Sequence, residues 1–149
     1  MRLLAPLLAL TLSGCLALVA PEGPSDIRDL VAARAKWNLR GAATYTIRGS
    51  TSCFCVYGGQ VVDVAVSHGV VTGVTLVATN AAVSSELAAG FKSVEQLFDV
   101  IDEAIRKDAQ RIEVEYDADR GFPTRLWIDW SDKIADEEYG FNINAVTVR

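Results

Sequence analysis

Apolar and polar positions repeat with two different periods along residues 25–149, and these periods predict two helices, each followed by three strands. Ser25 can cap the first helix, with acidic residues in its first turn, where they favour the positive end of the helix dipole. Gly41 is expected to end this helix. The predicted apolar stripe consists of Ile27, Leu30, Val31, Ala35 and Trp37.

A second helix is predicted to begin after Ser93. Ser93 and Gln96 have the spacing of a capping box, in which each side chain bonds the backbone N–H of the other residue. The helix is expected to end near Lys107, because cations favour the C-terminal end. Its apolar face consists of Val94, Leu97, Phe98, Ile101 and Ile105. Residues 80–90, small and polar, predict a loop or a loose helical turn.

Alternation with a period of two predicts strands at residues 43–50, 60–67, 70–77, 111–116, 124–130 and 141–148. His68 and Gly69 suit a two-residue hairpin turn, because both accept positive φ better than most residues. Short connections favour antiparallel pairing, and two amphipathic helices must bury their apolar faces on the sheet. The expected fold is therefore an α+β two-layer sandwich with a mainly antiparallel sheet, in the order α-βββ-α-βββ.

The N-terminal segment has the pattern of an export signal. Arg2 precedes a short apolar run, and Leu12-Ser13-Gly14-Cys15 resembles the lipobox of bacterial lipoproteins. In that family the chain is cut before the cysteine, whose sulfur and new amine are acylated. The alternative is cleavage after Ala20 by an ordinary signal peptidase, which would leave Pro21 at the cut. We expect residues 1–14 to be a lipoprotein signal peptide and Cys15 to carry lipid, including palmitate.

Residues 15–24 are interpreted as a lipidated tether before one α+β domain at residues 25–149. Nine extended residues reach at most about 30 Å, so the domain is expected to lie close to the membrane. Leu16, rather than an aspartate, follows the acylated cysteine. In Gram-negative lipoproteins an aspartate at that position resembles a signal for retention in the inner membrane, and this chain lacks it. The expected location of the protein is the cell envelope, and specifically the outer membrane if the host is Gram-negative.

Net charge narrows the partner classes. Without residues 1–14, the chain has 13 basic and 19 acidic side chains, a formal charge of −6. Phosphate backbones and anionic headgroups repel such a domain, so neither nucleic acid nor electrostatic docking to lipid is expected. Membrane affinity is expected to come from the lipid on Cys15, at roughly 0.8 kcal/mol for each buried methylene.

A further set of motifs extends over most of the domain. The most specific are Cys53-Phe54-Cys55, Gly121-Phe122-Pro123 and Ile134-Ala135-Asp136-Glu137. They are accompanied by Trp37, Tyr45-Thr46-Ile47, Val70, Leu97-Phe98-Asp99, Val114-Glu115-Tyr116-Asp117 and Ile128-Asp129. Over about residues 37–142, this order resembles the bacterial family called domain of unknown function 6174. The resemblance implies a secreted protein or lipoprotein, and it carries over no catalytic residue.

Cys53 and Cys55 are the first candidates for chemistry. In an extended strand their Cα atoms would lie about 6.6 Å apart, at the outer limit for a disulfide. Two close thiols rarely stay reduced in an oxidising envelope, which favours a local structural disulfide. Thiol exchange, soft-metal binding, and a larger ring closed by a partner chain are the alternatives.

Asp117 and Asp119 are a weak calcium candidate, because Asp117-x-Asp119-x-Gly121 resembles the start of a calcium loop. The bidentate glutamate expected downstream is missing, since Ile128 stands there. The alternative interpretation is a solvated acidic loop.

Aromatic side chains gather in the last third of the chain. Trp127 is expected on the strand face opposite Ile128, exposed beside Arg125 and Asp129. Such a surface can bind a protein or a glycan. The alternative is that the aromatic residues belong to the core, with one tryptophan partly covered.

No catalytic constellation is recognisable. The single histidine, His68, is expected on a solvated turn, whereas a serine or cysteine hydrolase needs an oriented histidine base. The favoured function is a non-enzymatic, membrane-anchored binding or structural module without a resident cofactor, whose partner is an envelope protein or a glycan. The alternative is an envelope thiol-redox or soft-metal-binding protein that uses Cys53 and Cys55.

Overall fold

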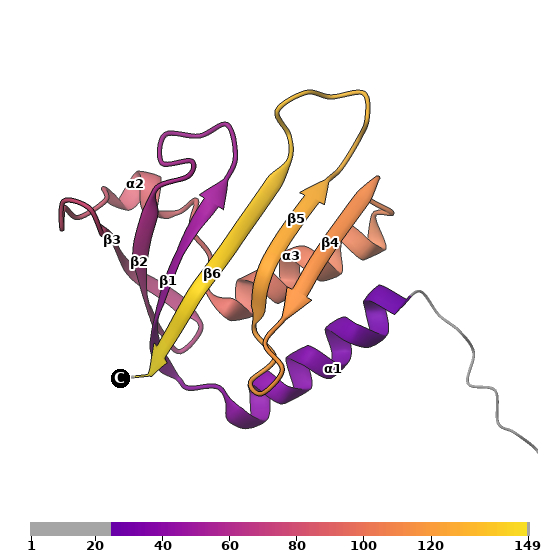
Figure 1. The fold of residues 1–149 in the computed structure, drawn as a ribbon, viewed down its shortest axis with the longest axis horizontal. Coiled ribbons are helices and arrows are strands. Elements are labelled where there is room, and N and C mark those ends of the chain that lie inside the picture. The colour runs from indigo at the N-terminus through magenta and orange to yellow at the C-terminus, as the bar shows by residue number, and fades with distance from the viewer. Residues whose placement is uncertain (1–24, 149) are drawn as a thin grey trace, which may run out of the picture.

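The computed structural model describes residues 25–148, which form one antiparallel sheet and three helices (Figure 1). The helices are α1 (Ser25–Arg40), α2 (Ser85–Ala88) and α3 (Val94–Arg106). The strands are β1 (Thr44–Ser52), β2 (Val61–Ser67), β3 (Val70–Leu76), β4 (Arg111–Tyr116), β5 (Pro123–Asp129) and β6 (Tyr139–Val148). The predicted α+β class and the order of long helices and strands are confirmed, with α2 as a single added turn.

The sheet joins two meanders through its centre. Its strand order is β3-β2-β1-β6-β5-β4, and every neighbouring pair is antiparallel. The last strand, β6, lies between β1 and β5 and so connects the first three strands to the last three (Figure 1). His68 and Gly69 form the β2–β3 turn with φ of 51° and 76°, as the hairpin prediction required.

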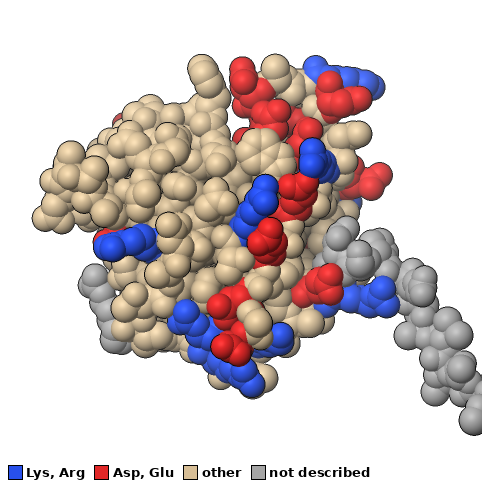
Figure 2. Space-filling model, in the orientation of Figure 1, with Lys and Arg blue, Asp and Glu red and all other residues tan. Residues whose placement is uncertain are grey.

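The open face of the sheet is divided by charge. In Figure 2, Lys, Arg, Asp and Glu gather over β4, β5 and the β5–β6 loop, whereas the surface over β1, β2 and β3 is nearly free of them. Residues 44–91 contain three such side chains, and the equally long stretch 92–139 contains 21. Arg48 and Asp63 on the neutral side pair with each other through two hydrogen bonds of 2.8 and 2.7 Å.

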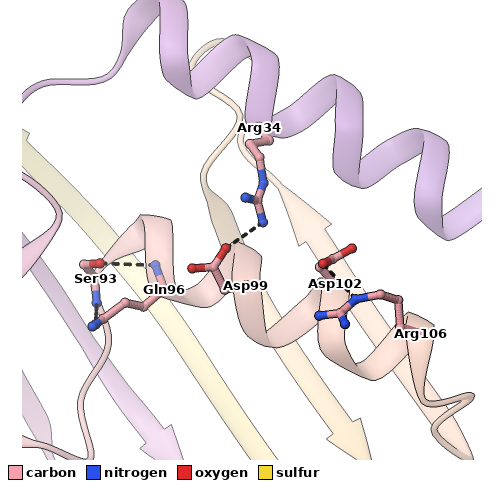
Figure 3. A network of polar contacts seen from close by, with 6 residues as sticks. All are labelled: Arg34, Ser93, Gln96, Asp99, Asp102 and Arg106. Atoms are coloured by element: carbon pink, nitrogen blue, oxygen red, sulfur yellow. Dashed lines mark hydrogen bonds and ion pairs between the residues drawn. The ribbon is translucent and has the colours of Figure 1, made fainter.

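Helix α3 supplies most of the helical contribution to the core. Ser93 Oγ accepts from the Gln96 N–H at 3.2 Å, and Gln96 Oε1 accepts from the Ser93 N–H at 2.9 Å, so the capping box is confirmed (Figure 3). The buried residues of this helix are Val94, Leu97, Phe98, Ile101 and Ala104, while Ile105 is half-buried. The periodic pattern therefore located this helix and its face correctly.

Helix α1 packs through a narrower stripe than predicted. Its buried residues are Leu30, Ala33 and Trp37, whereas Val31 and Ala35 are exposed. The i, i+3, i+7 spacing of the buried positions defines one face, which turns toward α3 and the β4–β5 turn. Arg34 reaches across to Asp99 on α3 at 3.0 Å (Figure 3). Among the described residues, no helix is long and apolar enough to cross a membrane.

Candidate functional site

The β1–β2 connection is closed by a disulfide between Cys53 and Cys55, with their Cα atoms 5.3 Å apart. The predicted disulfide is confirmed, but the segment is a bend beyond β1 rather than a strand, which brings the two Cα atoms closer than 6.6 Å. Cys55 is exposed and its sulfur lies 3.9 Å from the hydroxyl of Thr51. Phe54, between the cysteines, is 89% exposed. The bridge therefore presents an apolar tip to solvent.

A cavity of about 430 Å³ lies between this connection and α2. We call it the disulfide groove, defined by Cys53, Cys55, Tyr57, Leu87, Phe91 and Tyr139. Its lining comes from three stretches of chain, since α2 and the start of β6 reach the bend that follows β1. Glu86 carries the only charge among the lining residues. A groove of this composition favours an uncharged, apolar ligand group.

Tyr139 gives the groove a polar group without a partner. Its hydroxyl is buried and neither accepts nor donates a hydrogen bond within the described chain. Burial also raises the pKa of Tyr139 above its ordinary value, so the phenol is neutral at physiological pH. A buried hydroxyl left unpaired costs about 1–3 kcal/mol. Because the hydroxyl is buried, a ligand would have to displace neighbouring side chains before it could accept a hydrogen bond from Tyr139.

Comparison with known proteins places this arrangement in a family. A model of the family of unknown function DUF6174 matches residues 29–148. The chain belongs to this family. The match extends beyond the resemblance over residues 37–142 and runs from α1 to β6. Neither the curated proteins nor the solved structures compared with the chain include a match. The family therefore defines the domain without assigning a role to any residue.

A second polar cluster in the DUF6174 domain joins its two layers. Glu95 accepts hydrogen bonds from Trp37 Nε1 at 2.8 Å and from the Tyr45 hydroxyl at 2.5 Å. The Tyr45 oxygen accepts in turn from the Val94 N–H at 3.0 Å. Burial, and then the bond to Glu95, raise the pKa of Tyr45. The cluster satisfies its own polar groups and links α1, β1 and α3, which indicates a structural role.

The predicted calcium residues form a turn that docks on α1. Asp117 Oδ1 accepts from the backbone N–H groups of Asp119 and Arg120, at 3.1 and 2.7 Å. Neighbouring backbone carbonyls accept from Lys36 and Arg40 of α1. Gly121, at φ 82°, lies against α1, and a Cβ there would approach the Ala33 carbonyl oxygen to 2.3 Å. Within residues 25–148, no group of three or more His, Cys, Asp or Glu side chains is arranged to hold a metal ion.

The predicted aromatic surface lies on the open face of the sheet, and each member has a partner in the domain. Trp127 is half-buried and covers Gly140, where an added Cβ would lie 2.8 Å from its ring. Arg125 approaches Glu113 and Glu115 at 3.8 and 3.6 Å. Asp129 accepts from the Ser131 N–H at 3.1 Å. These contacts account for the three side chains without a ligand.

The remaining candidates lie apart from the groove. His68 is exposed on the β2–β3 turn, with Nδ1 3.1 Å from Ser67 Oγ. Cys15 and the tether lie outside the described residues. Sequence reasoning did not identify Leu87, Phe91, Tyr139 or Glu95 as members of a site. Each becomes notable only when segments distant in the sequence meet, and no local motif marks that meeting.

Proposed function

We propose that this DUF6174 protein is a non-enzymatic binding module anchored to the bacterial cell envelope, and that the disulfide groove holds the apolar part of its ligand. The observation that carries this proposal is the mainly apolar groove, with Glu86 as its one charged lining residue, together with the unpartnered Tyr139 hydroxyl. A bound group would bury apolar surface at about 25 cal/mol per Å², and it would accept a hydrogen bond from Tyr139 once neighbouring side chains uncover the hydroxyl. Envelope proteins and glycans are the partner classes that we expect.

The anchoring part of the proposal rests on Leu12-Ser13-Gly14-Cys15. Replacing Cys15 by serine should move the protein from the membrane fraction to the soluble fraction, or block its processing. Unchanged membrane partition of that variant would contradict lipid anchoring. In a Gram-negative host we expect the wild-type protein in the outer membrane.

The non-enzymatic part rests on the chemistry of the groove lining. Glu86 is the only charged lining residue, and general acid–base catalysis normally uses a positioned pair of titratable groups. His68 lies at the opposite end of β2, whose seven residues span roughly 20 Å. The groove therefore offers contacts for recognition, and no histidine, lysine or second carboxylate accompanies Glu86 among its lining residues.

A photo-crosslinking amino acid at Leu87 tests the binding site in cells that make the protein. Leu87 lines the groove and is 39% exposed. The matched control is the same amino acid at Val31, which is 63% exposed on α1. A discrete adduct from position 87 alone, weakened by Tyr139→Phe, is expected. Absence of an adduct, or the same adduct from both positions, would overturn the proposal.

Thiol exchange is a second candidate function, favoured by the exposure of Cys55. An external thiolate would attack Cys55 Sγ, break the disulfide and release Cys53 as the leaving thiolate. A second external thiol would then free Cys55 and form an external disulfide, while the pair gains two protons and two electrons. Equilibration in glutathione buffers separates the roles. A potential above about −230 mV favours exchange, and one below about −300 mV favours a structural bridge.

A further inference from the structure

The outer edge of β3 already pairs with an extended segment over half of its length. The Val83 N–H donates to the Val74 carbonyl at 2.9 Å, and the Leu76 N–H donates to the Ala81 carbonyl at 2.9 Å. Thr75 and Ala82 form the antiparallel bridge between these bonds. The chain then enters α2 at Ser85 and leaves the edge. The fold itself therefore demonstrates strand addition on this side of β3.

The other half of the edge, residues 70–73, has no such cover. Strand β3 is an edge strand of the sheet, and no residue of the described chain forms a bridge to the outer side of residues 70–73. An edge strand presents unpaired N–H and C=O groups to solvent or to a binding partner. These groups lie on the same edge of the sheet as those that pair with residues 81–83.

A second cavity, of about 500 Å³, lies along this uncovered half. We call it the β3 groove, defined by Val70, Val71, Thr72, Gly73, Ala88 and Phe91. The strand forms one wall and α2 the other, on the opposite side of α2 from Leu87 and the disulfide groove. An added strand would lie about 4.8 Å from β3, and every second side chain, on the face toward α2, would enter this cavity.

The two edges of the sheet differ in how well they are protected against pairing with a further strand. Strand β4, at the far edge, carries Arg111, Glu113 and Glu115, and charged side chains discourage edge pairing. Strand β3 has no charged residue from Val70 to Leu76, and Val70 is 61% exposed. Only the β3 edge thus combines free backbone groups, a neutral surface and a groove.

We propose that the β3 groove binds an extended, uncharged segment of a partner polypeptide, which adds to the sheet through backbone hydrogen bonds. The segment is uncharged because no lining residue of the groove could compensate a buried charge. Strand β3 carries a bulge at Thr72 within this half, since Ala65 pairs with Gly73 and Val66 pairs with Val71. The bulge limits the number of regular backbone hydrogen bonds, so apolar side chains in the groove must contribute specificity. A short extended segment is the expected occupant, because residues 81–83 of this chain already pair with the neighbouring half of β3 in that way.

Selection of a linear peptide library against the full-length chain tests this inference. The enriched peptides should share a short, uncharged, β-rich motif and should lose binding when alternate backbone nitrogens are methylated, since those N–H groups pair with β3. Val70→Lys should weaken binding by at least about tenfold, because a charged side chain on an edge strand disfavours pairing with another strand. The same substitution at Val31, with nearly equal exposure on α1, should leave binding unchanged.

Three results would overturn the inference. Equal binding to the Val70→Lys and Val31→Lys variants would place the peptide elsewhere. Loss of binding in Leu87→Asp with retention in Val70→Lys would assign the peptide to the disulfide groove. Concentration-dependent dimers that Val70→Lys abolishes would make a second copy the occupant of the edge. Circular dichroism of each variant checks that the fold is kept.

Discussion

The β1–β3 half of the sheet and the β4–β6 half use their side chains differently. The second half, with α3, is rich in charge on its surface and is closed by a charged edge strand. The first half is nearly neutral, has an uncovered edge, and exposes Phe54, Val56 and Val70. Exposed apolar side chains on a neutral surface indicate a region that meets other molecules. The comparison supports the proposal that the first half binds a partner, although both halves contribute buried residues to the core.

The ion pairs of the second half do not explain its contribution to stability. Arg34–Asp99 and Arg106–Asp102 lie on the surface, where such pairs contribute about 0–1 kcal/mol (Figure 3). The buried stripe of α3 stabilises the fold more, because each fully buried Leu or Phe side chain contributes about 1.5–3 kcal/mol. Charge in this half therefore protects the surface, and apolar packing holds the layers together.

A pair of Phe→Ala variants should show the largest contrast between the halves. Phe98 is 1% exposed between α3 and the sheet, so Phe98→Ala should lower the free energy of unfolding by about 3–5 kcal/mol. Phe54 is 89% exposed, so Phe54→Ala should change it by less than about 0.5 kcal/mol. Urea denaturation measures both. Equal losses would mean that the disulfide bend belongs to the core.

Local pattern explains why much of the fold could be predicted from the sequence. The hairpin at His68-Gly69, the capping box and the alternation of β1 depend on residues a few positions apart. The stripe of α1 was partly wrong because this helix touches the domain along a narrow line, which hydrophobicity alone does not define. Val31 is apolar yet 63% exposed, and Ala33 is buried because the β4–β5 turn at Gly121 lies against it.

Less of the candidate site could be predicted from the sequence, because contacts between residues far apart in the chain create it. The cysteine pair is visible as a motif, but its groove requires Leu87 and Tyr139 from other parts of the chain. The Glu95 cluster requires Trp37 and Tyr45, which lie 58 and 50 positions away. Polar side chains such as these look like ordinary surface or core residues until the sheet order brings them together.

Two Tyr→Phe variants should give the next largest contrast. Tyr45→Phe removes the bond to Glu95 and leaves the Val94 N–H without its acceptor, so it should cost about 1–3 kcal/mol. Tyr139→Phe removes a hydroxyl that has no partner in the described chain, so it should be neutral or slightly stabilising. Urea denaturation at neutral pH measures the difference. A costly Tyr139→Phe would indicate that its hydroxyl is already satisfied.

The raised pKa values of the same two tyrosines predict how the free energy of unfolding changes at high pH. The pKa of each is raised in the folded state from an ordinary value of 10.0, so the folded protein holds both protons more tightly than the unfolded chain. Their contribution to stability is therefore complete below about pH 10 and is lost as the pH rises above it. The unfolding free energy should fall as the pH rises above about 10, less steeply in either Phe variant. An unchanged slope in both would contradict the assignment.

The last contrast concerns the bridge itself, whose removal should affect stability modestly. The double variant Cys53→Ser and Cys55→Ser opens a ring of three residues, and the chain-entropy relation for so short a loop gives a cost of about 1.5 kcal/mol. The wall of the disulfide groove should loosen at the same time. The yield of the adduct formed at position 87 should therefore fall by more than the loss of stability explains. Tyr45→Phe is the matched control, because it costs as much stability while leaving the groove lining intact. If both variants reduce the adduct equally, general destabilisation explains the loss; if only the cysteine variant reduces it, the bridge serves recognition in the neutral half.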